Sequence, residues 1–313
     1  MTPKILITGA TGYVGGTVIA HLLSSTDPSI IPLTLDLLVR TPEAATKLNS
    51  TYGTRINTIP WNGLLETDFI ITTASNYDII INVGSGFIPS GALAFVRGLA
   101  KRIANNPSSP PPWLLHISGC TNLADKPITG VAEPNRIWED ANSRAVYDWA
   151  VAQEAISPYP QRTTEVGVLT LAHELGVNAI SLNTPIIFGE GEGLFNRQGI
   201  IIPTLLRYTL TMGYGFKLND TANFDWVHVA DLADAYVLLF RLIVDGKDEK
   251  IPRGKEGIVF PAVGRVLQTE IFERCLDVLF ERGALPREGT PEGKEVRLKT
   301  LQEVADEARV VPN

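Results

Sequence analysis

Near its N-terminus the chain carries a strand-like apolar run, a glycine-rich turn and an amphipathic segment in immediate succession, ILITGATGYVGGTVIAHLL. Gly9 permits a tight turn, Gly12 lets the backbone approach a pyrophosphate, and Gly15 allows a helix and a strand to pack closely. The amide groups at the start of a helix favour an anion. A glycine triplet alone is weak evidence, but this one lies at the first strand–helix turn of the chain and predicts a dinucleotide site.

Five more short apolar runs follow, separated by segments of helical length: LTLDLLVR, RINTIPW, DIIINVGSG, WLLHISG and NAISLNTPIIFG. Apolar strands that alternate with helices are typical of a parallel sheet covered on both faces. We therefore expect an α/β fold with a doubly wound parallel sheet, formed by residues 1–188 and 225–262. A smaller C-terminal substrate lobe would comprise 189–224 and 263–313, with GEGEGLFNRQG as a mobile lid over the substrate.

Composition excludes several classes of function. The net charge of -7 disfavours nucleic acid as a partner, because phosphate binding needs a positive face. Two cysteines, Cys120 and Cys275, give no disulfide framework and favour a cytoplasmic protein. No apolar run reaches the roughly 18 residues of a membrane span, so no membrane partner is expected. The four histidines are widely separated, and no metal site is expected.

The TGATGYVG loop resembles the TGxxGxxG loop of the extended and atypical short-chain dehydrogenase/reductases, the NAD(P)-dependent epimerase/dehydratase-like superfamily. INVGSG, LLHISG, TPIIFGEGEG and DWVHVADLADAYVLL follow in the order of the family's segments, and the details resemble a fungal-type branch. The resemblance implies a Rossmann fold, a nicotinamide cofactor, a small-molecule substrate and a possible homodimer. It assigns the cofactor to Gly9, Thr11, Gly12, Tyr13, Val14, Gly15, Arg40, Thr41, Gly84, Ser85, Ser118, Pro185 and Ile187.

The end of the second strand bears on the type of cofactor. An acid there usually binds the ribose hydroxyls of NAD, whereas an arginine accommodates the 2′-phosphate of NADP. Arg40 ends the strand and is followed by Thr41, while Asp36 lies four positions earlier as the competing candidate. We expect NADP(H).

The resemblance implies a catalytic serine or threonine, a tyrosine, and a lysine four residues after the tyrosine. Ser118 fits the first role. The alternative is that its hydroxyl is simply bonded to the backbone at the end of a strand. No lysine occurs between Lys126 and Lys217, and four residues after Tyr147 and Tyr159 stand Val151 and Thr163. The Tyr-x-x-x-Lys dyad is therefore absent.

The stretch SPYPQRTTEVGVL, residues 157–169, then carries the question of chemistry. Alignment through the following helix puts Gln161 near the lysine position and Glu165 one turn later. Arg162 could supply part of the lysine's positive charge, or it could be a solvated side chain at the start of a helix that Thr163 or Thr164 caps.

Three functions remain open on this evidence. The chain could be an NADP(H)-dependent oxidoreductase of short-chain dehydrogenase/reductase type, reducing a carbonyl on a small, fairly apolar metabolite with Tyr159 or Tyr147 as proton donor. It could use the same pocket as a non-redox lyase, cyclase or epimerase. It could also bind NADP without turnover, as a redox-silent sensor or regulator similar to NmrA-like proteins.

Overall fold

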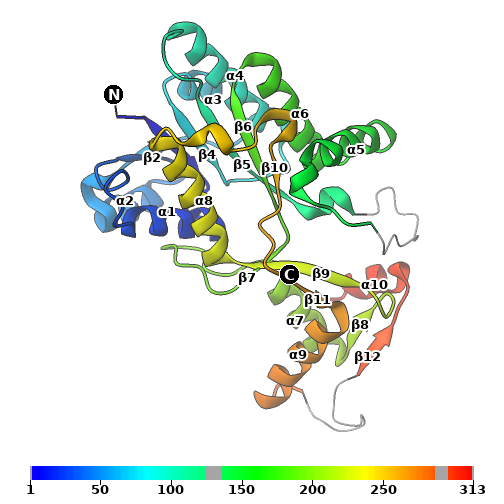
Figure 1. Ribbon diagram of the computed structural model, residues 1–313. Coiled ribbons are helices and arrows are strands. Elements are labelled where there is room, and N and C mark those ends of the chain that lie inside the picture. The colour runs from blue at the N-terminus through cyan, green and yellow to red at the C-terminus, as the bar shows by residue number, and fades with distance from the viewer. Residues whose placement is uncertain (1, 125–135, 286–294, 312–313) are drawn as a thin grey trace. The chain divides into compact units, whose positions relative to one another are not determined.

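The computed structural model describes residues 2–124, 136–285 and 295–311, and its central feature is a parallel sheet of seven strands (Figure 1). The strand order is β10-β6-β5-β4-β1-β2-β3, which changes direction between β1 and β4. This is the doubly wound arrangement, so the predicted fold class is confirmed. The strands are β1 (Ile5–Thr8), β2 (Leu35–Val39), β3 (Ile56–Pro60), β4 (Ile79–Asn82), β5 (Trp113–Gly119), β6 (Asn178–Thr184) and β10 (Ile258–Val259).

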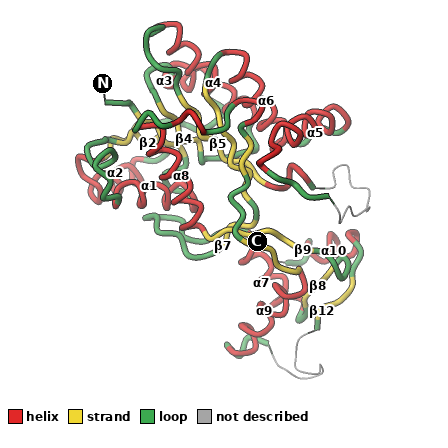
Figure 2. The backbone as a smooth tube through the Cα atoms, viewed as in Figure 1, coloured by secondary structure: helices red, strands yellow, loops and turns green. Residues whose placement is uncertain are grey.

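Helices connect these strands and cover the sheet (Figure 2). Among them, α3, α4 and α6 pack side by side, and α1 packs against α8. The helices are α1 (Tyr13–Ser24), α2 (Pro42–Tyr52), α3 (Thr67–Ala74), α4 (Pro89–Asn105), α5 (Ser143–Ile156), α6 (Pro160–Leu175) and α8 (Val229–Val244).

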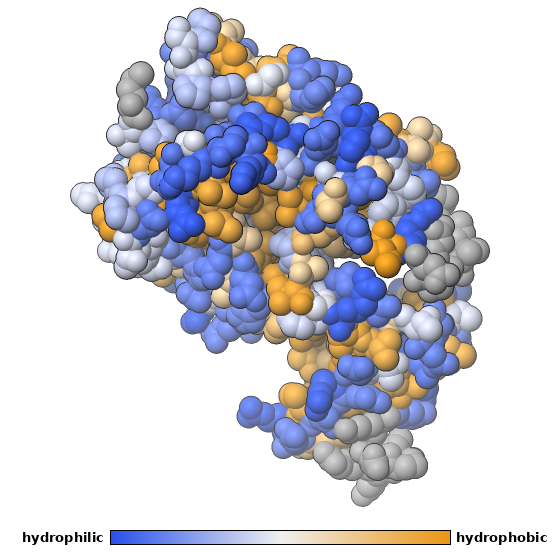
Figure 3. Space-filling view, in the orientation of Figure 1, coloured by the Kyte–Doolittle hydropathy of each residue, from blue (hydrophilic) through white to orange (hydrophobic). Residues whose placement is uncertain are grey.

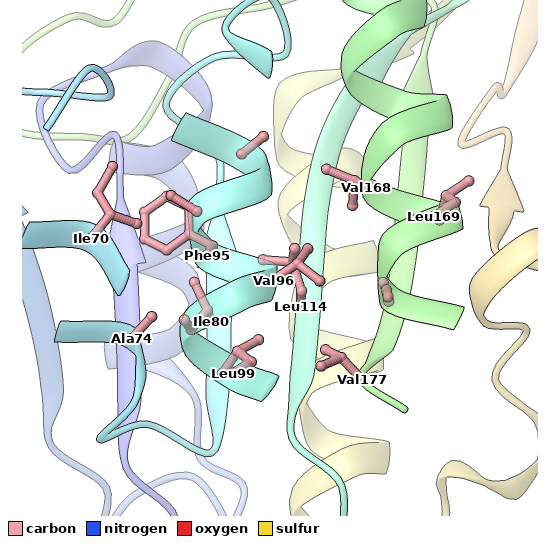
Figure 4. Packing of buried hydrophobic residues seen from close by; sticks show 14 of the residues in the cluster. Ile70, Ala74, Ile80, Phe95, Val96, Leu99, Leu114, Val168, Leu169 and Val177 are labelled. Carbon is pink, nitrogen blue, oxygen red and sulfur yellow. The ribbon is translucent and has the colours of Figure 1, made fainter. Parts of the chain in front are cut away.

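The core lies where α3, α4 and α6 meet the sheet, with α4 between the other two helices (Figure 4). Its side chains are almost wholly buried, and each large one contributes about 1.5–3 kcal/mol through removal of apolar surface from water. They include Ile70 and Ala74 of α3, Phe95, Val96 and Leu99 of α4, Val168 and Leu169 of α6, and Ile80 and Leu114 of the strands. The visible face of the molecule is mainly hydrophilic, with scattered hydrophobic groups (Figure 3).

The second unit has its own small sheets and an aromatic core. Tyr208, Phe216 and Phe272 pack together, with ring centroids 4.9 Å apart for the first two and 4.7 Å apart for the last two. One sheet pairs β7 (Ile186–Phe188), β9 (Asn223–His228) and β11 (Gly264–Leu267), and another pairs β8 (Gly215–Lys217) with β12 (Val296–Leu298). The helices are α7 (Ile201–Met212), α9 (Gln268–Glu281) and α10 (Leu301–Ala308).

The Rossmann unit comprises Met1–Pro185, Gly191–Arg197 and Val229–Pro261, and the second unit comprises Ile186–Glu190, Gln198–His228 and Ala262–Asn313. This division differs from the predicted one because β7 and β9 pair with each other outside the seven-stranded sheet. The apolar run NAISLNTPIIFG, which predicts one strand, is divided by Pro185 into β6 and β7. Proline has no N–H to donate to the ladder of the central sheet.

Residues 191–197, which we call the strap, return to the Rossmann unit and lie on α1 and α2. Glu192 N donates to Thr17 Oγ1 at 3.1 Å, Asn196 N donates to Thr11 O at 3.4 Å, and Lys47 Nζ donates to Leu194 O at 2.8 Å. Arg197 Nε and Gly191 O close the strap at 2.7 Å. The strap is therefore docked beside the glycine loop, and its role as a mobile lid over the substrate stays a prediction.

Helix α6 begins at Pro160, with Tyr159 in extended backbone as its N-cap. Proline suits the first helical position because the N–H that it lacks would have no partner inside the helix. The predicted capping by Thr163 or Thr164 is wrong, since their hydroxyls donate to the carbonyl oxygens four residues earlier, at 3.1 and 2.7 Å.

Within the described residues, no helix is both long and apolar enough to cross a membrane.

Candidate functional site

The glycine loop between β1 and α1 is built so tightly that two of its positions exclude a side chain. Gly9 has a positive φ of 74°, and a Cβ there would lie 2.7 Å from Val83 O. A Cβ on Gly15 would lie 2.2 Å from Gly9 O. The roles predicted for these two glycines, a tight turn and close packing of helix on strand, match this geometry.

The third glycine leaves the backbone open on one side. A Cβ on Gly12 would meet only the Gly9 backbone, and Gly12 N already donates to Gly9 O at 2.8 Å. Thr11 is half-buried, whereas Tyr13 and Val14 are buried in the first turn of α1. Burial raises the pKa of Tyr13 to about 12, so this hydroxyl stays protonated at neutral pH. An open backbone at a helix N-terminus fits a dinucleotide pyrophosphate.

At the end of β2, Arg40 is exposed, and Thr41 caps α2 by accepting from Ala44 N at 3.3 Å. Asp36, the competing candidate for binding the ribose, lies inside β2. Its two carboxyl oxygens accept from Asn57 Nδ2 at 2.8 Å and Tyr77 Oη at 2.7 Å. Only the arginine therefore stands at the strand end.

The turn after β4 joins the glycine loop to the end of β5. Gly84 N donates to Thr8 Oγ1 at 3.0 Å, and Ser85 Oγ accepts from Phe87 N at 3.1 Å. A Cβ on Gly86 would lie 2.9 Å from Ile117 O and 3.4 Å from Ser118 Cα. The ends of β1, β4 and β5 thus form one continuous edge.

Two hydroxyls stand at the accessible part of this edge. Tyr159 Oη donates to Thr121 Oγ1 at 3.3 Å, and Thr121 donates to Gln161 Oε1. Thr121 is exposed, and the ring of Phe87 meets that of Tyr159 edge to face, with centroids 6.0 Å apart. The sequence analysis missed Thr121, although it lies only three residues after Ser118.

Ser118 lies behind this pair, 2% exposed, with its hydroxyl on the side of α6. Its Oγ accepts from Asn122 Nδ2 at 2.9 Å, and the same amide donates to the Glu165 carboxyl at 2.7 Å. Thr184 Oγ1 donates to Ser118 O at 2.7 Å. Ser118 is therefore part of a buried network, while Thr121 presents a hydroxyl to the surface.

Glu165 is the centre of that network and is 1% exposed. Ser181 Oγ donates to its Oε1 at 2.6 Å, and Asn122 Nδ2 donates to its Oε2 at 2.7 Å. Asn183 Nδ2 lies 3.1 and 3.3 Å from the two oxygens. Burial raises the pKa of Glu165, and the hydrogen bonds from Ser118 and these three residues oppose that rise only in part.

Arg162 is fully buried, so its interpretation as a solvated side chain is wrong. Its guanidinium donates to Glu154 Oε2 at 3.2 Å, Asn122 O at 3.3 Å and Ser157 O at 2.6 Å. These contacts tie the end of α5 to the start of α6. The positive charge is engaged in holding the two helices together.

Tyr147, the other tyrosine candidate, packs in the core between α5 and α6. It is 5% exposed, and its Oη lies 2.6 Å from Thr170 Oγ1. Thr170 is nine residues after Gln161, which is about 13 Å along the helix axis. The structure thus brings Tyr159 and Gln161 together with Thr121, and it does not bring Tyr147 to them.

The last two predicted cofactor residues fall in different units. Pro185 follows β6 at the end of the central sheet, whereas Ile187 pairs with Val227 in the second unit.

Comparisons with known proteins agree with this fold. No family model matches the chain. The oxidase ucsJ of an Acremonium species is 26% identical over 302 residues, which cover 91% of this chain and 81% of the relative.

Three solved structures have similar folds. An engineered reductase has a TM-score of 0.60 at 14% identity and covers 99% of this chain and 94% of its own. A dTDP-glucose 4,6-dehydratase of Streptomyces venezuelae with bound NAD has a TM-score of 0.57 at 13% identity, with 98% and 90% covered. A UDP-glucuronic acid 4-epimerase of Bacillus cereus with bound NAD has a TM-score of 0.57 at 13% identity, with 95% and 87% covered. The predicted resemblance to the epimerase/dehydratase-like proteins is confirmed in the fold.

Proposed function

We propose that this chain, which has the fold of NAD(P)-dependent reductases, dehydratases and epimerases, is an NADP(H)-dependent oxidoreductase that reduces a carbonyl group. The observation that carries the proposal is the Tyr159–Thr121 hydroxyl pair. It lies at the end of β5, next to the turn that joins β5 to the glycine loop. Ligands of doubly wound sheets bind at this carboxyl edge.

The glycine loop would hold the pyrophosphate, since Gly12 leaves the backbone accessible at the start of α1. The exposed Arg40 supports NADP over NAD, because its guanidinium can pair with a 2′-phosphate. The engagement of Asp36 by Asn57 and Tyr77 supports the same choice. NADPH bound in this way supplies the hydride.

The chain's own residues would orient the carbonyl and supply the proton. The phenolic hydroxyl of Tyr159 is a hydrogen-bond donor and would serve as the acid. Its hydroxyl proton passes to the oxygen of the reduced carbonyl, and water then returns a proton to the phenolate. Tyr159 donates its proton to Thr121 in this structure, and Thr121 donates its own to Gln161 Oε1, so the Tyr159 O–H would turn from Thr121 to the carbonyl oxygen before the proton passes.

A small, fairly apolar substrate is supported by Phe87, which is 48% exposed beside the tyrosine ring. Redox chemistry is supported by the name of the Acremonium relative, an oxidase.

The test is NADPH oxidation against a panel of aldehydes and ketones by the full chain and by two matched variants. Tyr159→Phe should lower kcat by about 10²–10⁴-fold, the usual contribution of a general acid. Tyr147→Phe removes the same atom from a core tyrosine and should change kcat less than about threefold. Equal rates in both variants and the parent chain would contradict the role of Tyr159.

A redox-silent NADP-binding protein is the second candidate. It is favoured by the engagement of Arg162 with Glu154, Asn122 and Ser157, which leaves that charge unavailable to a tyrosine. Tight binding of NADPH without oxidation of any carbonyl would support this candidate. Product formed without consumption of the nucleotide would instead indicate a lyase, cyclase or epimerase.

A further inference from the structure

Among the residues that the structure describes, the buried carboxyl of Glu165 is held by neutral groups. Its oxygens receive hydrogen bonds from Ser181, Asn122 and Asn183. An ionised carboxylate that is nine-tenths or more buried is normally paired with a cation. The surroundings of Glu165 therefore favour retention of a proton.

The charged groups on the elements around α6 are engaged elsewhere or face solvent. Arg162 pairs with Glu154, and Arg102 of α4 pairs with Asp78. Burial lowers the pKa of His116 on β5 to about 4 and keeps its ring neutral. Arg97 and Lys101 are exposed on α4, and Arg144 pairs with Asp148 on α5. After α8, Lys255 lies over the Tyr147 ring, and Glu256 is exposed.

The network can satisfy either charge state of the carboxyl. Both amides turn their NH₂ groups to Glu165, while Asn122 Oδ1 and Asn183 Oδ1 are buried with no hydrogen-bond partner among the described residues. Rotation of either amide by a half-turn would present its oxygen as acceptor for the proton of a neutral carboxylic acid. The observed arrangement suits the ionised form, and the rotated arrangement suits the neutral form.

The network reaches the nucleotide edge through Ser118. Asn122 Nδ2 donates both to Glu165 Oε2 and to Ser118 Oγ, and the Ser118 Cα lies against Gly86 in the turn beside the glycine loop. Oxidised nicotinamide carries a positive charge that the reduced ring lacks. A positive charge near a carboxyl in a medium of low dielectric constant favours the ionised form.

We propose that Glu165 is a proton-holding residue of the nucleotide site, ionised when NADP⁺ is bound and neutral when NADPH is bound. This inference rests on the NADP(H) site of the proposed function. The carboxyl O–H bond breaks when NADP⁺ binds and the proton passes to solvent. The same bond forms again when NADPH replaces NADP⁺. In this scheme Glu165 is a positioning residue that does not touch the nucleotide, because Ser118 lies between it and the carboxyl edge of the sheet.

The experiment counts protons during binding. Titration calorimetry of NADP⁺ and of NADPH, each in buffers of different ionisation enthalpy between about pH 5 and pH 9, is performed on the full chain. We expect NADP⁺ binding to release close to one proton more than NADPH binding does. The NADP⁺ Kd should tighten by about tenfold for each unit by which the nucleotide lowers the pKa of Glu165.

Two variants complete the experiment. Glu165→Gln should abolish the proton release, and it should fold because a rotated Asn122 amide can accept from the new NH₂. Glu174→Gln makes the same change at an exposed position on α6 and should keep the release. A carbonyl-stretch infrared band of a neutral acid that NADP⁺ removes from the parent chain, and that Glu165→Gln lacks, would support the proposal.

Binding of both nucleotides with no proton exchange, or with exchange that persists in Glu165→Gln, would overturn the inference and leave the proposed reductase intact. Proton release without NADPH oxidation would support the inference while contradicting the proposed catalysis. Failure of both nucleotides to bind would overturn both.

Discussion

The glycine loop and the first two turns of α6 form adjoining parts of one edge, but they are built in different ways. In the glycine loop, backbone atoms fill the space: the oxygen of Gly9 occupies the volume that a side chain on Gly15 would need. At the start of α6, side chains fill it: Arg162 and Glu165 are both buried and hold partners from α5, β5 and β6. A site shaped by backbone tolerates almost no change, whereas one shaped by side chains can be altered group by group.

The second region also contains a contrast of its own. Arg162 is a buried cation whose charge is paired with Glu154, and Glu165 is a buried acid that forms no ion pair within the described part of the chain. The first charge has a partner that fixes it, and the second has neighbours that accept either charge state. Four tests, two of them with a matched control substitution, address these contrasts.

The largest effect is expected from Arg162→Met, which removes a fully buried charge but keeps much of the apolar stem. The free energy of unfolding in urea should fall by about 3–5 kcal/mol, because Glu154 and three backbone oxygens lose their donor. Arg144→Met removes an exposed partner of Asp148 and should cost less than about 1 kcal/mol. Similar losses of unfolding free energy in the two variants would mean that the Arg162–Glu154 pair does not hold α5 and α6 together.

Gly15→Ala and Gly167→Ala make the same change in the two regions. The first places a methyl group 2.2 Å from a backbone oxygen and should cost about 3 kcal/mol of unfolding free energy and abolish NADPH binding. The second places it in α6, 3.3 Å from the flexible Leu93 side chain, where helix propensity offsets the crowding. Its unfolding free energy should stay within about 1 kcal/mol. A comparable loss of unfolding free energy at both positions would contradict the distinction between a region shaped by backbone and one shaped by side chains.

Arg40→Asp tests the part of the nucleotide site that depends on a side chain. Loss of the charge-assisted contact to the 2′-phosphate should weaken NADPH by about 10- to 100-fold, and NADH should change less than about threefold. Fluorescence titration with both nucleotides measures the ratio. Equal weakening of both would remove Arg40 from the 2′-phosphate site.

Glu165→Gln should have the smallest effect, seen in how stability depends on pH. Burial raises the pKa of Glu165 in the folded protein, so between the unfolded and folded values the folded state holds the extra proton. The carboxyl's contribution is therefore fully present below the unfolded pKa and is lost as pH rises through the folded one. Glu165→Gln has no carboxyl to titrate. Its free energy of unfolding minus that of the parent should therefore increase with pH, by at most about 1.4 kcal/mol per pH unit. A difference that does not vary with pH would contradict the raised pKa.

The backbone-built region could be predicted from the sequence because its determinants are local. Gly9, Gly12 and Gly15 lie within one turn and one helix start, and the strands of the sheet follow from short apolar runs. The strap could not be predicted, because its place on α1 and α2 depends on contacts with residues about 150–180 positions away in the chain, such as Lys47 and Thr17.

The network at α6 was also beyond prediction. Asn122, Ser181 and Asn183 meet Glu165 only because β5 and β6 pair in the register Ser118 to Asn183. Thr121 gains its position from the short helical turn after β5, which no periodicity in the sequence marks. The roles of Tyr159, Gln161 and Ser118 in catalysis stay predictions.

The route of the chain bears on how the protein folds during synthesis. It passes between the two units after Pro185, Glu190, Arg197, His228 and Pro261. The last strand of the seven-stranded sheet, β10, leaves the ribosome only after β7, α7, β8 and β9 of the second unit have been made. The edge of β6 that pairs with β10 therefore stays unpaired until residue 258 has been made.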